Sequence, residues 1–231
     1  MSSAIATDRE PQRVVSRDPS QTPSSARTTR IVVGVLGALV ALAGIEHGIG
    51  EIQQGSVRPE GVVIESWPNA AAMEILQGEP AMTIIPNLLV TGILAIIVAI
   101  VFGAWAIRFG GHRHVASGLI ALSVVLLLLG GGFGPPLLGI VIGFGARRLP
   151  STPRHGRTAD WLASAWPWLL GAAVVGYLGL MPGTVLISYF TGVESAGLTS
   201  SLAAIAFSGA ALALVGARAH DRVSSGQTIS T

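Results

Sequence analysis

The 231-residue sequence contains no cysteine and no lysine, and charged residues of all kinds make up only 11% of it. Without cysteine, the chain has no disulfide, iron–sulfur cluster, thiolate zinc site or cysteine nucleophile. The charged fraction is less than half of that in ordinary globular proteins, whereas 50% of the residues are hydrophobic. The basic residues are all arginines, which is a composition typical of GC-rich bacterial genomes.

The few charges are grouped between long uncharged runs, a pattern typical of a polytopic membrane protein. Apolar stretches predict six helices, over residues 30–52, 86–109, 115–129, 136–147, 160–181 and 196–217. A helix of about 20 residues covers the roughly 30 Å hydrocarbon core of a bilayer. We therefore expect an all-α integral membrane protein, with its helix bundle over residues 30–218.

The third and fourth stretches differ from the others. Residues 115–146 carry no charge, but the segment GGGFGPP at 130–136 cannot continue a helix. Two short helices joined by this turn would each cover roughly 20 Å, which is less than the bilayer core. They either thin the bilayer locally or form a re-entrant hairpin that does not cross it.

The remaining segments are polar connections and tails. Residues 1–29 and 219–231 are predicted to be tails. The first is predicted to be disordered because it is rich in Ser, Thr, Pro and Arg and has almost no apolar periodicity. The acidic connection 53–85 is predicted to contain a short interfacial helix over 68–77, which starts near Pro68 and stops at Gly78. The pair Pro182-Gly183 is predicted to end the fifth helix.

Arginine is distributed unevenly between the predicted loops. Thirteen of the fourteen arginines fall in the two tails, at the helix ends directly beside them, or in the loops 108–114 and 147–160, and only Arg58 falls in the alternate set. Under the positive-inside rule, the arginine-rich set lies in the cytoplasm. We therefore expect the bacterial cytoplasmic membrane, with both termini inside and the 53–85 loop outside.

The first apolar stretch ends in the ionisable residues Glu46, His47 and Glu51. Charged residues within a membrane helix cost roughly 2.5–3.5 kcal/mol at its centre and are functional candidates by default. His47 and Glu51 share a helix face, whereas Glu46 projects about 100° away from His47. The three residues either form a proton or cation site, or only hydrogen-bond to neighbouring helices while Glu51 meets water.

A metal site needs three or four ligands, and this helix face supplies only His47 and Glu51, although the acidic loop contains further carboxylates. Bis-histidine haem ligation is excluded there, because His47 is the only histidine predicted near the outer side. The sequence therefore predicts no metal and no cofactor.

Glycine-rich segments form a second set of candidates. A broken helix can bind ions through its free carbonyls, but a simple tight turn is favoured here because no matching break occurs elsewhere. The residues of this turn are Gly130, Gly131, Gly132, Gly134, Pro135 and Pro136. Residues predicted to allow close helix packing are Gly37, Ala41, Gly44, Gly48, Gly139 and Gly143.

Function is less defined than topology, since no nucleotide-binding, hydrolase or metalloprotease motif occurs. We expect a bilayer-embedded structural or partner-binding protein, without nucleic acid, that acts as a homo-oligomer or with a membrane partner. One alternative is a small secondary transporter or ion-conducting protein that uses Glu46, His47 and Glu51. A second alternative is an enzyme acting on lipid at the outer face.

Overall fold

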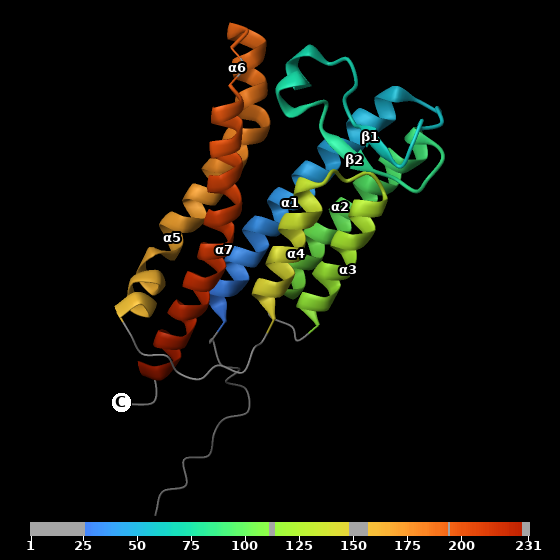
Figure 1. The fold of residues 1–231 in the computed structure, drawn as a ribbon. Coiled ribbons are helices and arrows are strands. Elements are labelled where there is room, and N and C mark those ends of the chain that lie inside the picture. Colours follow the sequence, from blue (N-terminus) through green and yellow to red (C-terminus); the bar gives the residue numbers. More distant parts are fainter. Residues whose placement is uncertain (1–25, 111–113, 148–156, 194, 228–231) are drawn as a thin grey trace, which may run out of the picture.

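The computed structural model describes residues 26–110, 114–147, 157–193 and 195–227, so most of the predicted N-terminal tail and the last four residues of the predicted C-terminal tail lie outside the described residues. The described part is mainly helical, which confirms the predicted helical class (Figure 1). Its α-helices are α1 (Arg27–Gln54), α2 (Leu88–Phe109), α3 (Val115–Leu128), α4 (Gly134–Ala146), α5 (Arg157–Leu178), α6 (Thr184–Thr191) and α7 (Ala196–Gln227).

Among the described residues, four helices are long and apolar enough to cross a membrane. These helices are Arg27–Gln54, Leu88–Phe109, Asp160–Thr191 and Ala196–Ser224. Large apolar side chains such as Trp168, Val175 and Phe190 are exposed on their surfaces, as expected where lipid replaces water. Helices α3 and α4 are shorter apolar helices, so the crossing of the membrane by all six predicted segments stays a prediction.

The helices form two groups that meet along α1, α4 and α7 (Figure 1). In the first group α1 packs mainly on α2, and α3 packs on α4. In the second group α5 packs along α7. Val33, Leu36, Phe102, Leu119 and Ile142 are fully buried in the first group, so α1 has one face in the interior of the bundle.

Small residues let α1 and α2 approach closely. The facing pairs are Gly37 with Ala106, Ala41 with Gly103, Gly44 with Ala99 and Gly48 with Gly92. A methyl group added at Gly44 would lie 2.8 Å from the Cβ atom of Ala99, so larger residues would force the helices apart. On α4, Gly139 faces Ser123 and Gly143 faces Ile120 of α3.

The connection between α1 and α2 contains a small β-ribbon that the all-α prediction missed. Strands β1 (Val63–Glu65) and β2 (Pro80–Met82) pair antiparallel, and the 3₁₀ helix η1 (Ala71–Leu76) replaces the longer helix predicted over 68–77. Three-residue strands are too short for an alternating pattern to reveal them. Backbone hydrogen bonds from Ile84 to Leu128 and from Gly130 to Met82 fasten this connection to the α3–α4 turn.

The prediction that Pro182-Gly183 ends the fifth helix is wrong. A π-helical turn, η2 (Gly179–Gly183), carries the helix on into α6. The wider turn accommodates Pro182, which has no N–H to donate and would crowd the preceding turn of an α-helix. The Thr184 hydroxyl also donates to the Leu180 carbonyl, so this carbonyl keeps a partner.

The last helix also extends beyond the predicted end at 217, and continues to Gln227. Asp221 explains this extension, because it contacts the start of α1. Its carboxylate accepts hydrogen bonds from the backbone N–H groups of Thr28 at 3.0 Å and Thr29 at 2.9 Å, and from the Thr29 hydroxyl at 2.7 Å. A tertiary contact therefore stabilises a segment that the sequence alone marks as a polar tail.

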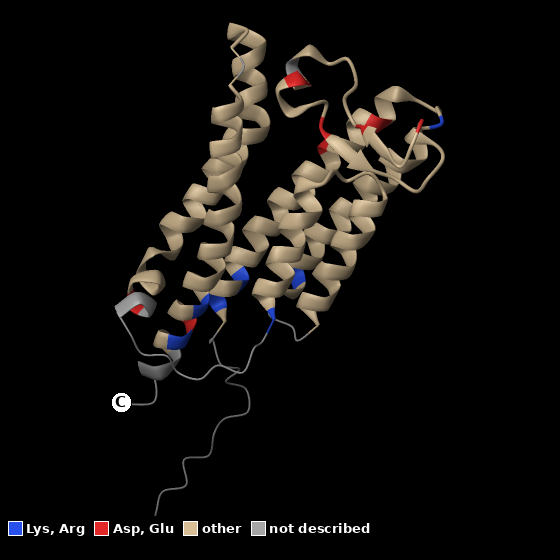
Figure 2. Ribbon diagram, in the orientation of Figure 1, with Lys and Arg blue, Asp and Glu red and all other residues tan. Residues whose placement is uncertain are grey.

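Charged side chains of the described residues collect at the two ends of the molecule (Figure 2). We call the end that holds the β-ribbon the acidic end, and the opposite end, where α1 begins and α2 and α4 terminate, the arginine end. Acidic residues of the connection at the acidic end are Glu60, Glu65, Glu74 and Glu79, beside the single Arg58. This separation places the candidate site far from most of the positive charge.

Candidate cation site at the acidic end

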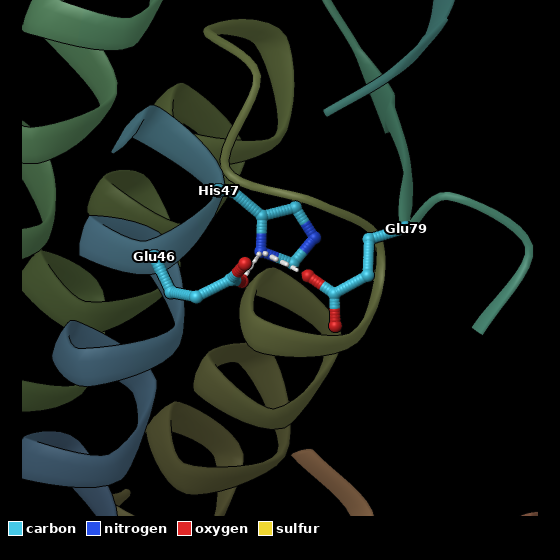
Figure 3. A group of neighbouring side chains, drawn as sticks. All are labelled: Glu46, His47 and Glu79. Carbon is cyan, nitrogen blue, oxygen red and sulfur yellow. Dashed lines mark ion pairs between the residues drawn. The ribbon is translucent and has the colours of Figure 1, made fainter. Parts of the chain in front are cut away.

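Two carboxylates and one imidazole converge at the acidic end (Figure 3). Glu46 and His47 lie in α1, and Glu79 is the residue immediately before β2. The His47 Nδ1 atom lies 3.0 Å from Glu46 Oε2 and 3.4 Å from Glu79 Oε2. One nitrogen or oxygen atom from each of the three residues lies within 4.8 Å of the others. We call these three residues the acidic cluster.

The His47 imidazole is shared among several oxygens. Its Nδ1 atom also lies 3.0 Å from the carbonyl oxygen of Ala43, one turn earlier in α1. A ring nitrogen carries at most one proton, so these three oxygens compete for a single N–H donor. The imidazole alone therefore does not satisfy both carboxylates.

The backbone holds Glu79 in position beside α1. Its N–H donates to the Leu76 carbonyl at 3.0 Å, and its own carbonyl accepts from the Ser66 N–H at 3.1 Å. Its φ angle is 53°, which is uncommon for a residue other than glycine. The turn before β2 is therefore fixed by hydrogen bonds in a conformation that directs Glu79 to the cluster.

Burial makes the charge of this cluster costly. His47 and Glu79 are only 6% and 9% exposed. Apart from the ion pairs that Glu46 Oε2 and Glu79 Oε2 share with His47 Nδ1, these two oxygens and Glu46 Oε1 have no hydrogen-bond partner within the described residues. Burial raises the pKa of Glu79 to about 8; the charge of His47 opposes this shift, and the neighbouring Glu46 adds to it. The cluster therefore needs a proton or another cation to balance its carboxylates.

The glycine turn predicted as a separate candidate lies directly against the polar residues of α1. Gly130 and Gly132 have φ angles of 85° and 75°, which favour glycine. A methyl group at Gly132 would collide with the His47 imidazole, and one at Gly130 would collide with the Glu51 carboxylate. The turn therefore covers both side chains. The two sites that the sequence predicts separately are in contact in the structure.

Other residues of this turn have structural roles. Gly131 packs against Leu126, and Gly134 has open space around it. Pro135 and Pro136 lie in the first turn of α4, where the missing proline N–H leaves no hydrogen bond unmade. These contacts describe a tight turn that begins α4.

Glu51 lies apart from the acidic cluster. It is fully buried beneath Gly130, and neither of its carboxylate oxygens has a hydrogen-bond partner among the described residues. The interpretation in which Glu51 meets water is therefore wrong for this structure. The structure brings Glu46 and His47 together with Glu79 in place of Glu51.

A cavity of about 180 Å³ borders the cluster. His47 and Glu79 line it together with Tyr177 of α5, whose buried hydroxyl has no hydrogen-bond partner among the described residues. The rest of the wall is mostly apolar and includes Phe133, Leu138, Leu180, Met181 and Phe207. The cavity therefore lies where the two groups of helices meet, and each group contributes at least one polar residue to its wall.

Sequence reasoning did not single out Glu79 as a site residue. The 32-position separation between His47 and Glu79 follows no helical or strand period. The only sequence signal for Glu79 is a general one, namely that it belongs to the acidic connection, which could supply further ligands. The β-ribbon that positions Glu79 was itself not predicted.

These features define a helical protein with membrane-length helices and a buried acidic cluster beside a cavity. In the comparisons with known proteins, no family model, no curated protein and no solved structure matches the chain. The geometry of the site is therefore the basis for the proposed function.

Proposed function

We propose that the protein binds a cation at Glu46, His47 and Glu79 and exchanges it for protons, as a small secondary transporter. We place it in the bacterial cytoplasmic membrane, with both termini inside and the acidic end outside, because of the arginine bias. The single observation that carries this function is the excess of buried carboxylates over positive partners beside a cavity.

Proton exchange follows from the charge of the cluster. With both carboxylates ionised, the three residues carry a net negative charge even when the imidazole is protonated. A buried site avoids such a charge by taking up a proton or a cation. Protons and cations therefore compete for the same oxygens, which is the requirement for coupled exchange.

The position of the cavity supports movement rather than static binding. Its walls come from α1, α4, α5 and α7, and so from both helix groups. Alternating access in many transporters arises when one helix group rocks against another around a central site. A change in the contact between the two groups would change access to the cavity.

Transport is tested with purified protein in liposomes that contain a trapped pH indicator. A cation gradient imposed across the vesicle membrane should drive proton movement. The Glu79→Gln variant should show no such proton movement. The matched control is Glu74→Gln, because Glu74 is an exposed carboxylate of the same connection. We expect this control to retain the flux of the unmodified protein.

The same experiment separates the alternative functions. Equal flux in Glu79→Gln and in the unmodified protein would contradict the proposal. Absence of flux together with turnover of vesicle lipid would favour an enzyme acting on lipid. Absence of both activities, with a stable partner co-purifying, would favour the embedded structural or partner-binding protein.

A further inference from the structure

We infer that the cation taken by this site is organic, with a primary ammonium head and a compact apolar body. This inference rests on the proposed function, since the head occupies the acidic cluster. It adds the cavity as the part of the site that selects the body of the ligand. Two independent features carry it, namely the apolar walls of the cavity and the buried polar groups of Glu79 and Tyr177 that line it.

The walls of the cavity are suited to hydrocarbon. Phe133 and Leu138 line one side, and Leu180, Met181 and Phe207 come from the second group of helices. Binding sites for small molecules combine apolar walls with a few placed polar groups that orient the ligand. A hydrated inorganic ion would gain nothing from these apolar walls.

The polar groups fit an ammonium head. Glu79 and Tyr177 are both buried and line the cavity. Among the described residues the Tyr177 hydroxyl has no hydrogen-bond partner, and Glu79 Oε2 has only its 3.4 Å ion pair with His47 Nδ1. A primary ammonium has three N–H donors. It can donate to the Glu79 carboxylate and to the Tyr177 oxygen, and its charge balances the excess of carboxylates in the acidic cluster.

The volume of the cavity limits the body of the ligand. A dry engineered cavity of about 150 Å³ holds benzene, and this cavity measures about 180 Å³. A body of about six or seven carbons, linear or as one ring, fills this space. Benzylammonium is therefore a suitable probe, and benzyl alcohol is its uncharged counterpart of nearly equal shape.

A divalent metal ion is the main competitor for the cluster. Three donor groups lie close enough to hold one, but the His47 Nδ1 atom already contacts the Ala43 carbonyl in its own helix. A metal at Nδ1 would have to replace that contact. Metal binding would also leave the apolar cavity and Tyr177 without a role.

The test is calorimetric titration of the full-length protein in lipid nanodiscs, with empty nanodiscs as the blank. Benzylammonium should bind at least tenfold more tightly than benzyl alcohol, which is the scale of one hydrogen bond to a charged group. Glu79→Gln should remove this preference, whereas Glu74→Gln should retain it. Parallel titrations with Zn²⁺ and Mn²⁺ measure the competing occupant.

A second variant tests the cavity separately from the charge. Leu180→Trp adds bulk at a half-buried wall position and should weaken benzylammonium binding at least tenfold while leaving the acidic cluster intact. Tyr177→Phe should weaken it less, by a fewfold, because only one hydrogen bond is lost. Thermal unfolding of each variant shows whether it is folded.

Distinct outcomes separate this inference from the proposed function. Equal binding of the amine and the alcohol, or zinc binding that Glu79→Gln abolishes without amine binding, would overturn the organic-cation inference. Either result would leave the transport proposal to the liposome assay. Selective amine binding without any proton movement would support the inference and contradict transport.

Discussion

Glu79 shows how the environment of one side chain determines its chemistry. The residue is nearly fully buried and faces Glu46 and His47 from α1 and Tyr177 from α5. Its pKa is raised to about 8, chiefly by burial. At neutral pH the proton is therefore held mainly by the folded protein, whereas an unfolded chain would have released it.

This difference predicts how stability depends on pH. The folded state binds more protons than the unfolded state between the ordinary glutamate pKa of 4.5 and about 8. Stability from Glu79 is therefore fully present below pH 4.5 and is lost as pH rises through about 8. Denaturant unfolding across this range should show the decrease in stability, and Glu79→Gln should make this decrease smaller. An unchanged pH profile in Glu79→Gln would contradict this explanation.

Gly132 provides a second test at the residue scale. Gly132→Ala places a methyl group against the His47 imidazole at a backbone angle that favours glycine. We expect a loss of about 1–3 kcal/mol in the free energy of unfolding, measured by denaturant titration. Gly134→Ala is the control, because nothing lies near the added methyl group and the position is helical. Equal stability of the two variants would show that the turn does not constrain His47.

The candidate site was partly predictable at this scale. Glu46 and His47 stand out because ionisable residues are rare in an apolar stretch. Their partner Glu79 does not, because its approach depends on a ribbon of two three-residue strands. The glycines at 130 and 132 marked a break in the helix, but their contacts with Glu51 and His47 depend on tertiary packing.

Among the contacts between elements, the contact between α7 and the start of α1 stabilises the arginine end. The first N–H groups of a helix have no partner within the helix, and α1 has no local side-chain cap at Ala26. Asp221 of α7 supplies the missing acceptor, and its negative charge is favourable at a helix N-terminus. One side chain therefore joins the two helix groups at this end.

Removing this acceptor should destabilise the protein. We expect Asp221→Ala to lose about 1–3 kcal/mol of unfolding free energy, because the N–H groups of Thr28 and Thr29 lose their partner. Asp221→Asn should lose less, since its amide oxygen can still accept one hydrogen bond. Hydrogen exchange of the first turn of α1 provides the measurement. Protection equal to that of the unmodified protein in Asp221→Ala would exclude this role.

The boundaries of these elements were less predictable than their existence. Long apolar runs give α1, α2 and the start of α7 within a few residues of their predicted limits. The continuation of α7 to Gln227 depends on Asp221, and the continuation of α5 into α6 depends on a π-helical turn at Pro182. Neither feature has a local sequence signal, because both are set by packing or by a rare backbone geometry.

At the scale of the whole molecule, the separation of charge defines the proposed orientation. Acidic residues of the connection lie at one end, and the arginines of α1, α2 and α7 lie at the other (Figure 2). Exposed apolar side chains of the membrane-length helices lie between these ends. In the orientation that we propose from the positive-inside rule, the acidic cluster lies near the outer surface.

The absence of cysteine makes this orientation easy to test. Single cysteines are introduced as Glu74→Cys and Arg108→Cys, both at exposed positions. A membrane-impermeant maleimide applied to intact cells should label the first variant, whereas the second should be labelled only after permeabilisation. Labelling of both variants in intact cells would contradict the proposed topology.

The proposal that Glu79 is protonated at neutral pH can be tested directly by measuring the protonation of its carboxyl group. Infrared difference spectra of the protein in nanodiscs, recorded during a pH titration, report the carbonyl band of protonated carboxyl groups. We expect a band to be lost with a midpoint near pH 8, and we expect Glu79→Gln to reduce this change, whereas Glu74→Gln retains it in full. A Glu79 already ionised well below neutral pH, with identical spectra for the unmodified protein and Glu79→Gln, would contradict it.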